Sequence, residues 1–193
     1  MAKREYKQSK RLEAAAETRQ RIVEAVVELH RTVGPRLTTI AEAARRAGVQ
    51  RLTVYKHFPD EAGLVMATQG HWLTQHPPPD AGQWAMILDP DARLRVALRE
   101  LYLWYADTEP MTQNVMRDAP AMPSFTAVLS LLREHIREGA EILSQGRLGD
   151  PVWTLATLNV VQNFETWRVL VREQGLTLGE AVELSLEWVR SVM

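Results

Sequence analysis

Cysteine is absent from this chain, and glycine and proline are scarce, with ten of each among 193 residues. Without cysteine the chain can form no disulfide, no thiolate metal site and no cysteine nucleophile. No apolar run approaches the roughly 18 residues of a membrane-spanning helix. The charged N-terminal segment also lacks the apolar core of a signal peptide. We therefore expect a cytoplasmic protein with no membrane association.

Catalytic signatures are missing as well. The chain contains no G-x-S-x-G, H-E-x-x-H, G-x-x-x-x-G-K-[ST] or G-x-G-x-x-G motif. His71 and His76 have no obvious carboxylate partner, so they make a poor metal pair. Glu134 and His135 are adjacent and point to different sides of a helix. We expect no enzymatic activity, no cofactor and no metal site.

The charge is unevenly distributed, although the net charge is only −1. Residues 1–58 contain 13 Lys and Arg against 6 Asp and Glu, whereas the rest of the chain contains 10 basic and 18 acidic residues. A basic end joined to an acidic body is typical of a protein whose basic end faces nucleic acid. A solvated charged surface explains the charge alone equally well.

Residues 38–64 carry the most informative pattern, TTIAEAARRAGVQRLTVYKHFPDEAGL. Thr39 and Glu42 have the spacing of a capping box at the start of a short helix. Gly48 stands where a tight turn requires positive φ, and a second short helix follows over about residues 50–57. This helix-turn-helix arrangement presents its second helix to the DNA major groove.

The second helix has an inner and an outer side. Val54 and Phe58, four residues apart, are expected to face the core with Ile22 and Val26 of a first helix over residues 14–33. An outward arginine can donate two hydrogen bonds to guanine, and the other polar groups can reach phosphates. The predicted DNA-binding residues are Thr38, Thr39, Gln50, Arg51, Leu52, Thr53, Tyr55, Lys56 and His57. An ordinary solvated helix face is the alternative.

The segment resembles the DNA-binding signature of TetR-family transcriptional regulators. The matching residues are Thr38, Ala44, Ala47, Gly48, Val49, Thr53, Tyr55, Phe58 and Leu64. They cover about a quarter of the chain and agree with the family in spacing and residue type across three elements. The resemblance implies an all-α fold of about nine helices, with a three-helix head, a connecting helix and a ligand-binding, dimerising body.

Three positions depart from the family pattern. Gln50 stands where a small hydroxyl residue usually caps the recognition helix, so we expect a weaker cap. Ala43 replaces a larger aliphatic residue. Glu61 occupies a position where many members place a phosphate-contacting lysine, and a glutamate there would repel a phosphate. The phosphate contact is therefore not carried over to Glu61.

The chain divides into three predicted regions: a mobile basic arm over residues 1–13, a DNA-binding domain over 14–60 and a helical body over 61–193. The arm's cations, such as Lys3, Arg4 and Lys7, are free to lie along DNA or to remain unbound. In the body we expect helices over 90–107 and 110–117, a break at 119–123, a helix from Ser124, a continuous helix over 151–173 and a last helix capped by Thr177 and Glu180.

The last two helices are expected to form a homodimer interface, because the helix over 151–173 has apolar residues on two faces. A larger monomeric core is the alternative. Six tryptophans make an aromatic ligand pocket plausible in the body. The candidate ligand-binding residues are Tyr105, Phe125, Asn163, Phe164 and Trp167. Plain core packing explains the same residues.

Two functions remain open at this point. The first is a homodimeric regulator, released by an unknown small-molecule effector, that represses from near-palindromic double-stranded DNA. The second is a small-molecule-binding or protein-interaction module that no longer binds specific DNA, for which the departures at Gln50 and Glu61 are the support.

Overall fold

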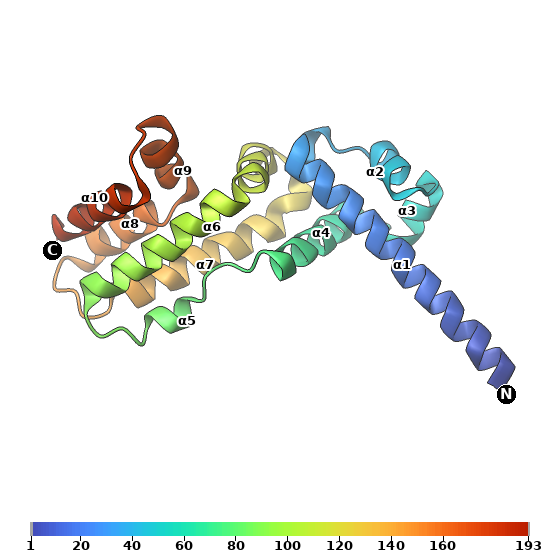
Figure 1. Cartoon of the computed structure of the whole chain (residues 1–193), viewed down its shortest axis with the longest axis horizontal. Coiled ribbons are helices and arrows are strands. Elements are labelled where there is room, and N and C mark those ends of the chain that lie inside the picture. The colour runs from blue at the N-terminus through green and yellow to red at the C-terminus, as the bar shows by residue number, and fades with distance from the viewer. Residues whose placement is uncertain (1, 193) are drawn as a thin grey trace. The chain divides into compact units, whose positions relative to one another are not determined.

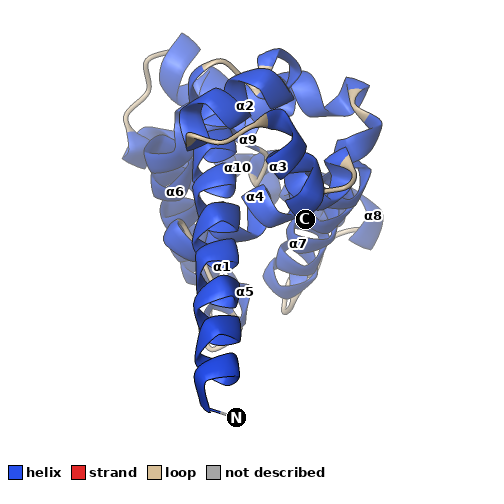
Figure 2. Ribbon diagram, turned by 90° about the vertical axis from the view of Figure 1, so that its right-hand side faces the viewer, coloured by secondary structure: helices blue, strands red, loops and turns tan. Residues whose placement is uncertain are grey.

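The computed structural model describes residues 2–192, apart from the side chains of residues 2–5 and 7. Ten α-helices, three short 3-10 turns and one π-helical segment build this part of the chain, which holds no strand (Figures 1 and 2). The predicted all-α fold class is confirmed, with ten helices where the sequence indicated about nine.

The α-helices are α1 (Ala2–Thr32), α2 (Ile40–Ala47), α3 (Arg51–His57), α4 (Glu61–Gln75), α5 (Ala81–Trp84), α6 (Pro90–Asp118), α7 (Thr126–Ser144), α8 (Pro151–Val161), α9 (Phe164–Trp167) and α10 (Leu178–Arg190). The other segments are the 3-10 turns η1 (Pro35–Leu37), η2 (Ala119–Ala121) and η3 (Pro123–Phe125), and the π-helix η4 (Arg168–Glu173).

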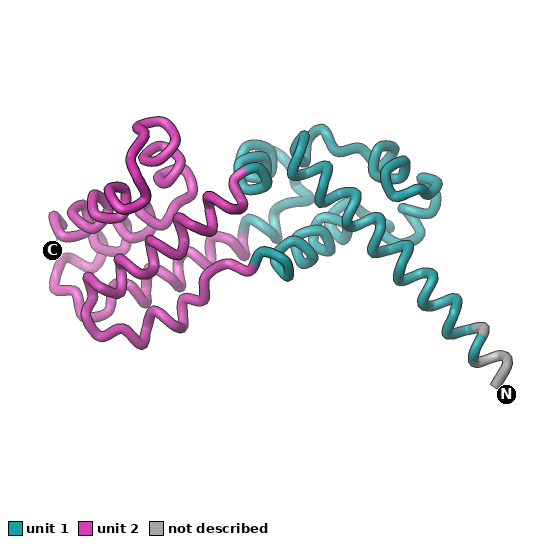
Figure 3. Tube along the Cα trace, in the orientation of Figure 1, with its two compact units in different colours: residues 1–76, 110–129 teal, residues 77–109, 130–193 magenta. Residues whose placement is uncertain are grey.

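The chain forms two compact units (Figure 3). Unit 1 comprises Met1–His76 and Pro110–Leu129, and unit 2 comprises Pro77–Glu109 and Ser130–Met193. Unit 1 therefore contains the helix-turn-helix together with α4 and a distant segment of sequence. The domain boundary predicted at residues 60/61 stays a prediction. It separates a DNA-binding region from a helical body by function, whereas the two compact units are defined by which residues pack together.

The core of unit 1 joins α1 to the helix-turn-helix. Ile22 and Val26 of α1 pack in one buried cluster with Val54 and Phe58, as the periodicity predicted. The alanines on the inner side of α2 belong to the same cluster and let that helix approach α1 closely. The first helix thereby fixes where α3 presents its outer side.

The end of α1 is held by the end of α6. The Asn114 side-chain amide donates to the carbonyl oxygens of His30 and Arg31 at 3.0 and 2.9 Å. These are among the terminal carbonyls that a helix leaves without an internal partner. Asp118, buried beside the turn, accepts from the backbone N–H of Arg36 at 3.2 Å and from the guanidinium of Arg117. The 110–118 segment thus belongs structurally to the head.

Unit 2 is organised around α6. Its inner face carries Leu94, Leu98, Leu101 and Tyr105, all buried. The buried Arg93 ties two loops together, because its guanidinium donates to backbone carbonyls of residues 87, 88, 142 and 145. Saturating the donors of a buried arginine in this way is what makes its burial tolerable.

Helix α1 begins at Ala2, whereas the periodicity placed its start near Ala14. No glycine or proline precedes Gly34, and local pairs such as Ser9 with Glu13 at 2.7 Å support the added turns. The predicted polar arm therefore has a helical backbone. The contacts expected of Lys3, Arg4 and Lys7 lie outside the described side chains.

Helix α6 runs through Pro110, where the sequence predicted a break between two helices. A proline inside a helix removes one backbone hydrogen bond and costs about 3 kcal/mol. Packing on both sides offsets that cost, since Tyr105 is buried before the proline and Met111 after it. The break predicted at 119–123 is confirmed, as η2 and η3 follow there.

The helix predicted over 151–173 is instead three segments, α8, α9 and η4. The chain turns at Asn163, whose backbone is extended and whose side chain accepts from the Glu165 N–H at 2.9 Å. Two tyrosines of α6 bind the carbonyls that the break exposes. The Tyr102 hydroxyl donates to the Val161 carbonyl at 2.8 Å, and the Tyr105 hydroxyl donates to the Gln162 carbonyl at 2.7 Å. These long-range partners make the break stable.

Candidate nucleic-acid interface

The helix-turn-helix follows the local signals of the sequence. Thr39 caps α2 by accepting from the Glu42 N–H at 3.2 Å. Gly48 has φ 67°, the left-handed conformation that glycine adopts without a steric penalty. Gln50 precedes α3 and gives it no side-chain cap, as expected. The turn is thus fixed by residues 39–50 alone.

The outer side of α3 is open to solvent (Figure 1). Leu52 and Tyr55 are 64% and 52% exposed, unusual values for large apolar or aromatic side chains. Arg51 and Lys56 are also exposed, while His57 is half-buried. A helix that holds its apolar positions in the core and offers cations and hydrogen-bonding groups outward is suited to enter a DNA groove.

Two arginines of α2 differ from Arg51 in one respect. Arg45 and Arg46 pair with the Glu42 carboxylate at 2.7 and 3.1 Å, and these guanidiniums lower the pKa of Glu42 to about 2. Neither Arg51 nor Lys56 pairs with a carboxylate within residues 2–192. The α3 cations are therefore available to an external anion.

The start of α4 is fixed by a side-chain cap. Asp60 caps the helix by accepting from the Gly63 N–H at 2.7 Å. Glu61 follows in the first helical turn and is exposed. Its charge is favourable at the positive end of a helix and unfavourable beside a phosphate.

Several residues that position α3 escaped the sequence reading. Arg19 of α1 lies over the Phe58 ring, with its guanidinium carbon 4.7 Å from the ring centroid. Asn114, Arg117 and Asp118 hold the turn after α1 from a segment that the sequence places far away. No local sequence pattern predicts these contacts. The partners of Asn114, Arg117 and Asp118 near the turn lie more than 80 residues away, and Arg19 and Phe58 lie on different helices.

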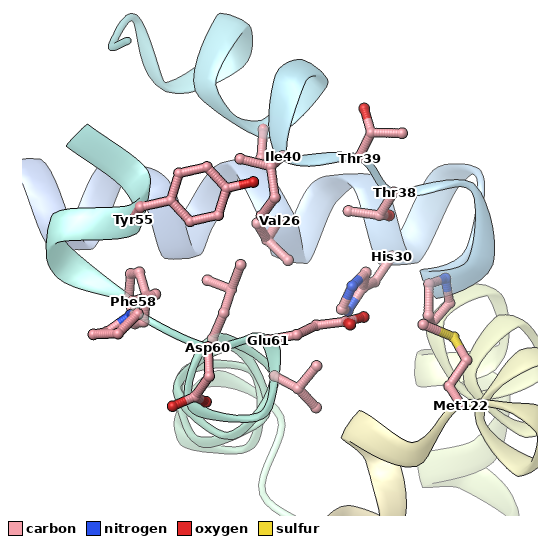
Figure 4. Close-up of a pocket in the computed structure, with 15 residues that line it drawn as sticks. Val26, His30, Thr38, Thr39, Ile40, Tyr55, Phe58, Asp60, Glu61 and Met122 are labelled. Atoms are coloured by element: carbon pink, nitrogen blue, oxygen red, sulfur yellow. The ribbon is translucent and has the colours of Figure 1, made fainter. Parts of the chain in front are cut away.

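Unit 1 also contains a pocket of about 340 Å³ beneath the helix-turn-helix (Figure 4). Three predicted DNA-binding residues, Thr38, Thr39 and Tyr55, line it, together with His30 of α1 and Glu61 of α4. The ring of Tyr55 extends over the pocket from α3. Three of the predicted DNA-binding residues therefore also line a pocket.

The five candidate ligand-binding residues fall into both units. Tyr105, Phe164 and Trp167 form one buried cluster in unit 2, with ring centroids 5.4 to 5.9 Å apart. Asn163 lies beside them as the cap of α9. Phe125 is in the core of unit 1, 5.7 Å from the His30 ring.

Helices α8 and α10 contact each other and expose apolar side chains. Val152, Trp153 and Val160 of α8 are 76%, 66% and 53% exposed, and Trp188 of α10 is 37% exposed. Residues 152, 156 and 160 recur every four positions, so they share one face of α8. Contiguous apolar faces of this kind are typical of protein interfaces.

The described residues show no sign of a metal site or a membrane-spanning helix. No group of three or more His, Asp or Glu is placed there to hold a metal ion. None of the described helices is long and apolar enough to cross a membrane.

Comparison with known proteins gives the same reading of the head. Residues 22–68 match the family described as "Bacterial regulatory proteins, tetR family". The chain is 39% identical over 71 residues to the uncharacterized HTH-type transcriptional regulator TtgW of Pseudomonas putida, a match that covers 35% of this chain and 53% of the relative. The chain thus matches only about half of that relative's length.

Solved structures resemble the chain over a larger share of its length. A TetR transcription regulator from Haloarcula marismortui has a TM-score of 0.66 at 18% identity, covering 92% of this chain and 98% of its own. A transcriptional regulator from Rhodococcus sp. has a TM-score of 0.63 at 17% identity, covering 90% and 96%. At these identities the likeness establishes the fold alone. Residues 22–68 therefore match the tetR family of bacterial regulatory proteins in sequence, and the whole chain shares the fold of these solved regulators.

Proposed function

We propose that the chain is a homodimeric, sequence-specific DNA-binding repressor that a small molecule releases from its operator. One observation carries the proposal. Helix α3 exposes Arg51 and Lys56, unpaired within residues 2–192, while Val54 and Phe58 anchor its other side in the core. Such a helix has a fixed position and free cations, the two requirements for reading a groove.

The outer residues of α3 have different roles in this proposal. Arg51 reads a guanine through its O6 and N7 acceptors, and Thr53 and Leu52 contact base edges or a thymine methyl. Lys56, His57 and Tyr55 bind phosphates and fix the register of the helix. Thr38, Thr39 and Gln50 lie at the starts of the two helices and complete the phosphate contacts.

Dimerisation supplies the second recognition helix. The exposed apolar faces of α8 and α10, with Val152, Trp153, Val160 and Trp188, support an interface between two copies of the chain. A two-fold axis through it gives a near-palindromic operator, with recognition helices about 34–36 Å apart or somewhat more.

The effector is proposed to bind in unit 2 near Tyr105, Phe164, Trp167 and Asn163. Aromatic walls with a polar group at one side suit an apolar or planar compound. The effector would act by preferring a conformation whose two heads no longer fit the operator, and its differential affinity sets the size of the effect. Phe125, in the core of unit 1, is left outside this proposed site.

Selection from a random duplex library, followed by fluorescence anisotropy on the selected sequence, tests the proposal. Arg51→Ala should lose discrimination between the selected duplex and a scrambled one by about 1–3 kcal/mol. Lys56→Ala should weaken binding to both duplexes and reduce the salt slope by about 1 per head. Arg45→Ala is the matched control, because Arg45 lies on α2 and pairs with Glu42.

Two outcomes would contradict the proposal. If no duplex were enriched in the selection, the chain would be the ligand-binding or interaction module that the departures at Gln50 and Glu61 allow. If Arg45→Ala and Arg51→Ala had equal effects, α3 would not be the reading helix.

A further inference from the structure

The pocket in unit 1 has the dimensions of a small-molecule site. Its volume of about 340 Å³ lies at the lower end of the range for ligand pockets, roughly 300–1,000 Å³. Its apolar lining comes from α1, α2 and α4 and includes Val26, Ile40 and Leu64. None of the four residues proposed for the effector site in unit 2 belongs to it. It is therefore separate from the effector site proposed above.

His30 is the polar group that the fold leaves unsatisfied in this pocket. The residue is only 5% exposed, and its ring packs 5.7 Å from that of Phe125. No described side chain or backbone group forms a hydrogen bond with the ring nitrogens. Asn114 contacts His30 only at its backbone carbonyl. Burial lowers the pKa of His30 to about 4. At neutral pH the ring therefore offers one N–H donor and one nitrogen acceptor to a pocket occupant.

The charges around the pocket select the sign of the occupant. Its lining includes two carboxylates, Asp60 and Glu61, and neither lysine nor arginine. The Asp60 side chain is engaged in capping α4 and points away from the pocket, whereas Glu61 extends toward His30 (Figure 4). Glu61 has no hydrogen-bond or ion-pair partner within the described chain. A carboxylate without a partner, in a pocket that also holds a neutral imidazole, favours a cation and repels an anion.

We propose that this pocket binds a small amphipathic amine. Its ammonium group pairs with the Glu61 carboxylate and donates to a ring nitrogen of His30, and its apolar body lies between α1, α2 and α4. The charge-assisted hydrogen bond gives orientation, and the apolar lining excludes water from it.

Binding at this place acts on the helix-turn-helix directly. Ile40 and Ala43 of α2 and Tyr55 of α3 line the pocket, so an occupant contacts both helices of the motif. Tyr55 is also a proposed phosphate ligand, and this step rests on the proposed DNA-binding function. An amine that engages Tyr55 lowers DNA affinity, and DNA lowers amine affinity by the same factor.

Calorimetric titration of the full chain with 2-phenylethylamine near pH 7.5, without DNA, tests the pocket. We expect a dissociation constant on the order of 1 mM, as for a small fragment. The uncharged 2-phenylethanol and the anionic 3-phenylpropanoate should bind at least about tenfold more weakly. Glu61→Gln should weaken the amine about tenfold. Glu17→Gln is the matched control, since it removes the same charge from an exposed position of α1 outside the pocket, and it should bind the amine as the wild type does.

NMR provides the second measurement. Amide shifts on adding the amine should concentrate in α1, α2 and α4. His30→Gln, which keeps a polar side chain but removes the imidazole, should weaken binding several-fold. Wild-type affinity in Glu61→Gln, equal binding of the carboxylate compound, or shifts concentrated in residues 130–192 would each overturn the proposal.

A DNA arm separates the two hypotheses. The amine should weaken binding to the selected duplex in the wild type but not in Glu61→Gln. If the chain selects no duplex, the titration without DNA still decides the pocket. If the titration fails, the selection experiment still decides DNA recognition.

Discussion

Units 1 and 2 treat their polar groups differently. In unit 2 the buried hydroxyls of Tyr102 and Tyr105 both donate to backbone carbonyls at the break after α8. In unit 1 the buried ring of His30 has no hydrogen-bond partner in the described chain, and Gln50 starts α3 without a side-chain cap. Thr154, a buried hydroxyl without a partner, is an exception in unit 2.

The difference indicates where each unit obtains its function. A satisfied buried hydrogen bond contributes about 1 kcal/mol, whereas an unsatisfied buried polar group costs about 1–3 kcal/mol. Unit 2 therefore uses its polar groups for stability. Unit 1 keeps some of them unpaired, which leaves them available to DNA or to a small molecule. The predictions below test this contrast in order of decreasing effect.

A substitution at Gly34 tests the close contact between the turn after α1 and the end of α6. Its φ of 94° and ψ of 159° lie in a region that only glycine occupies readily. An added Cβ would collide with the side chains of Arg117 and Asp118. Gly34→Ala should lower the free energy of unfolding by about 3 kcal/mol or more, measured by urea denaturation. Gly175→Ala is the control, with positive φ but no atom within 4 Å of the new Cβ, and should cost only about 1 kcal/mol. Equal losses would show that the contact with α6 does not matter.

His30 tests the cost of the unpaired ring. Its pKa is about 4 in the folded state, below the usual 6.5, because burial disfavours the charged form and the nearby Asp118 charge opposes this only in part. Its stabilisation is therefore complete above pH 6.5 and is lost as pH falls toward 4. Between pH 7 and pH 5 the free energy of unfolding should fall by about 2 kcal/mol more in the wild type than in His30→Gln.

That window lies above the range in which the neighbouring Asp118 carboxylate titrates. Arg117 lowers the pKa of Asp118 further below its usual value. Parallel pH curves for the wild type and His30→Gln would mean that the ring is not desolvated, and the contrast between the units would disappear.

Tyr102 tests the opposite case, a buried hydroxyl in unit 2 that has partners. Tyr102→Phe leaves the Val161 carbonyl without its donor and should cost about 1.5 kcal/mol in thermal or urea unfolding. Tyr6→Phe should change stability by less than about 0.5 kcal/mol, because Tyr6 is 59% exposed on α1. If Tyr102→Phe left the free energy of unfolding unchanged, the break after α8 would need no support from α6.

A substitution at Gln50 should have the smallest effect, and it should stabilise the protein. Gln50→Ser should add the missing cap to α3 and raise the free energy of unfolding by about 0.5–1 kcal/mol. Thr39→Ala, at the equivalent position of α2, should lower it by a similar amount. If Gln50→Ser were neutral, the α3 terminus would already be satisfied by other groups.

Local signals predicted the head well. Gly48, the Thr39 cap and the inward pair Val54 and Phe58 each depend on neighbours within a few residues, so the sequence predicts them correctly. The capping box of Thr177 and Glu180 was predictable for the same reason.

Features that depend on distant partners were not predictable. The break at Asn163 is stabilised by hydroxyls from α6, and the continuity of α6 through Pro110 depends on packing on both sides. The pocket of unit 1 is a space between α1, α2, α3 and α4, and its volume depends on how these helices pack and not on a local sequence pattern. The sequence indicated that Glu61 is unusual, but not that it lines the same pocket as His30.

Under the proposed DNA-binding function, Glu42 affects how the protein would search a genome for its operator. Because its carboxylate pairs with both Arg45 and Arg46, these three residues together carry one positive charge instead of two. Non-specific affinity rises steeply with the number of phosphates neutralised. The triad therefore keeps the attraction of the head to random DNA low, so fewer molecules are held at the many competing sites. A modest hold on irrelevant sequence leaves a larger share of the protein free to find its operator.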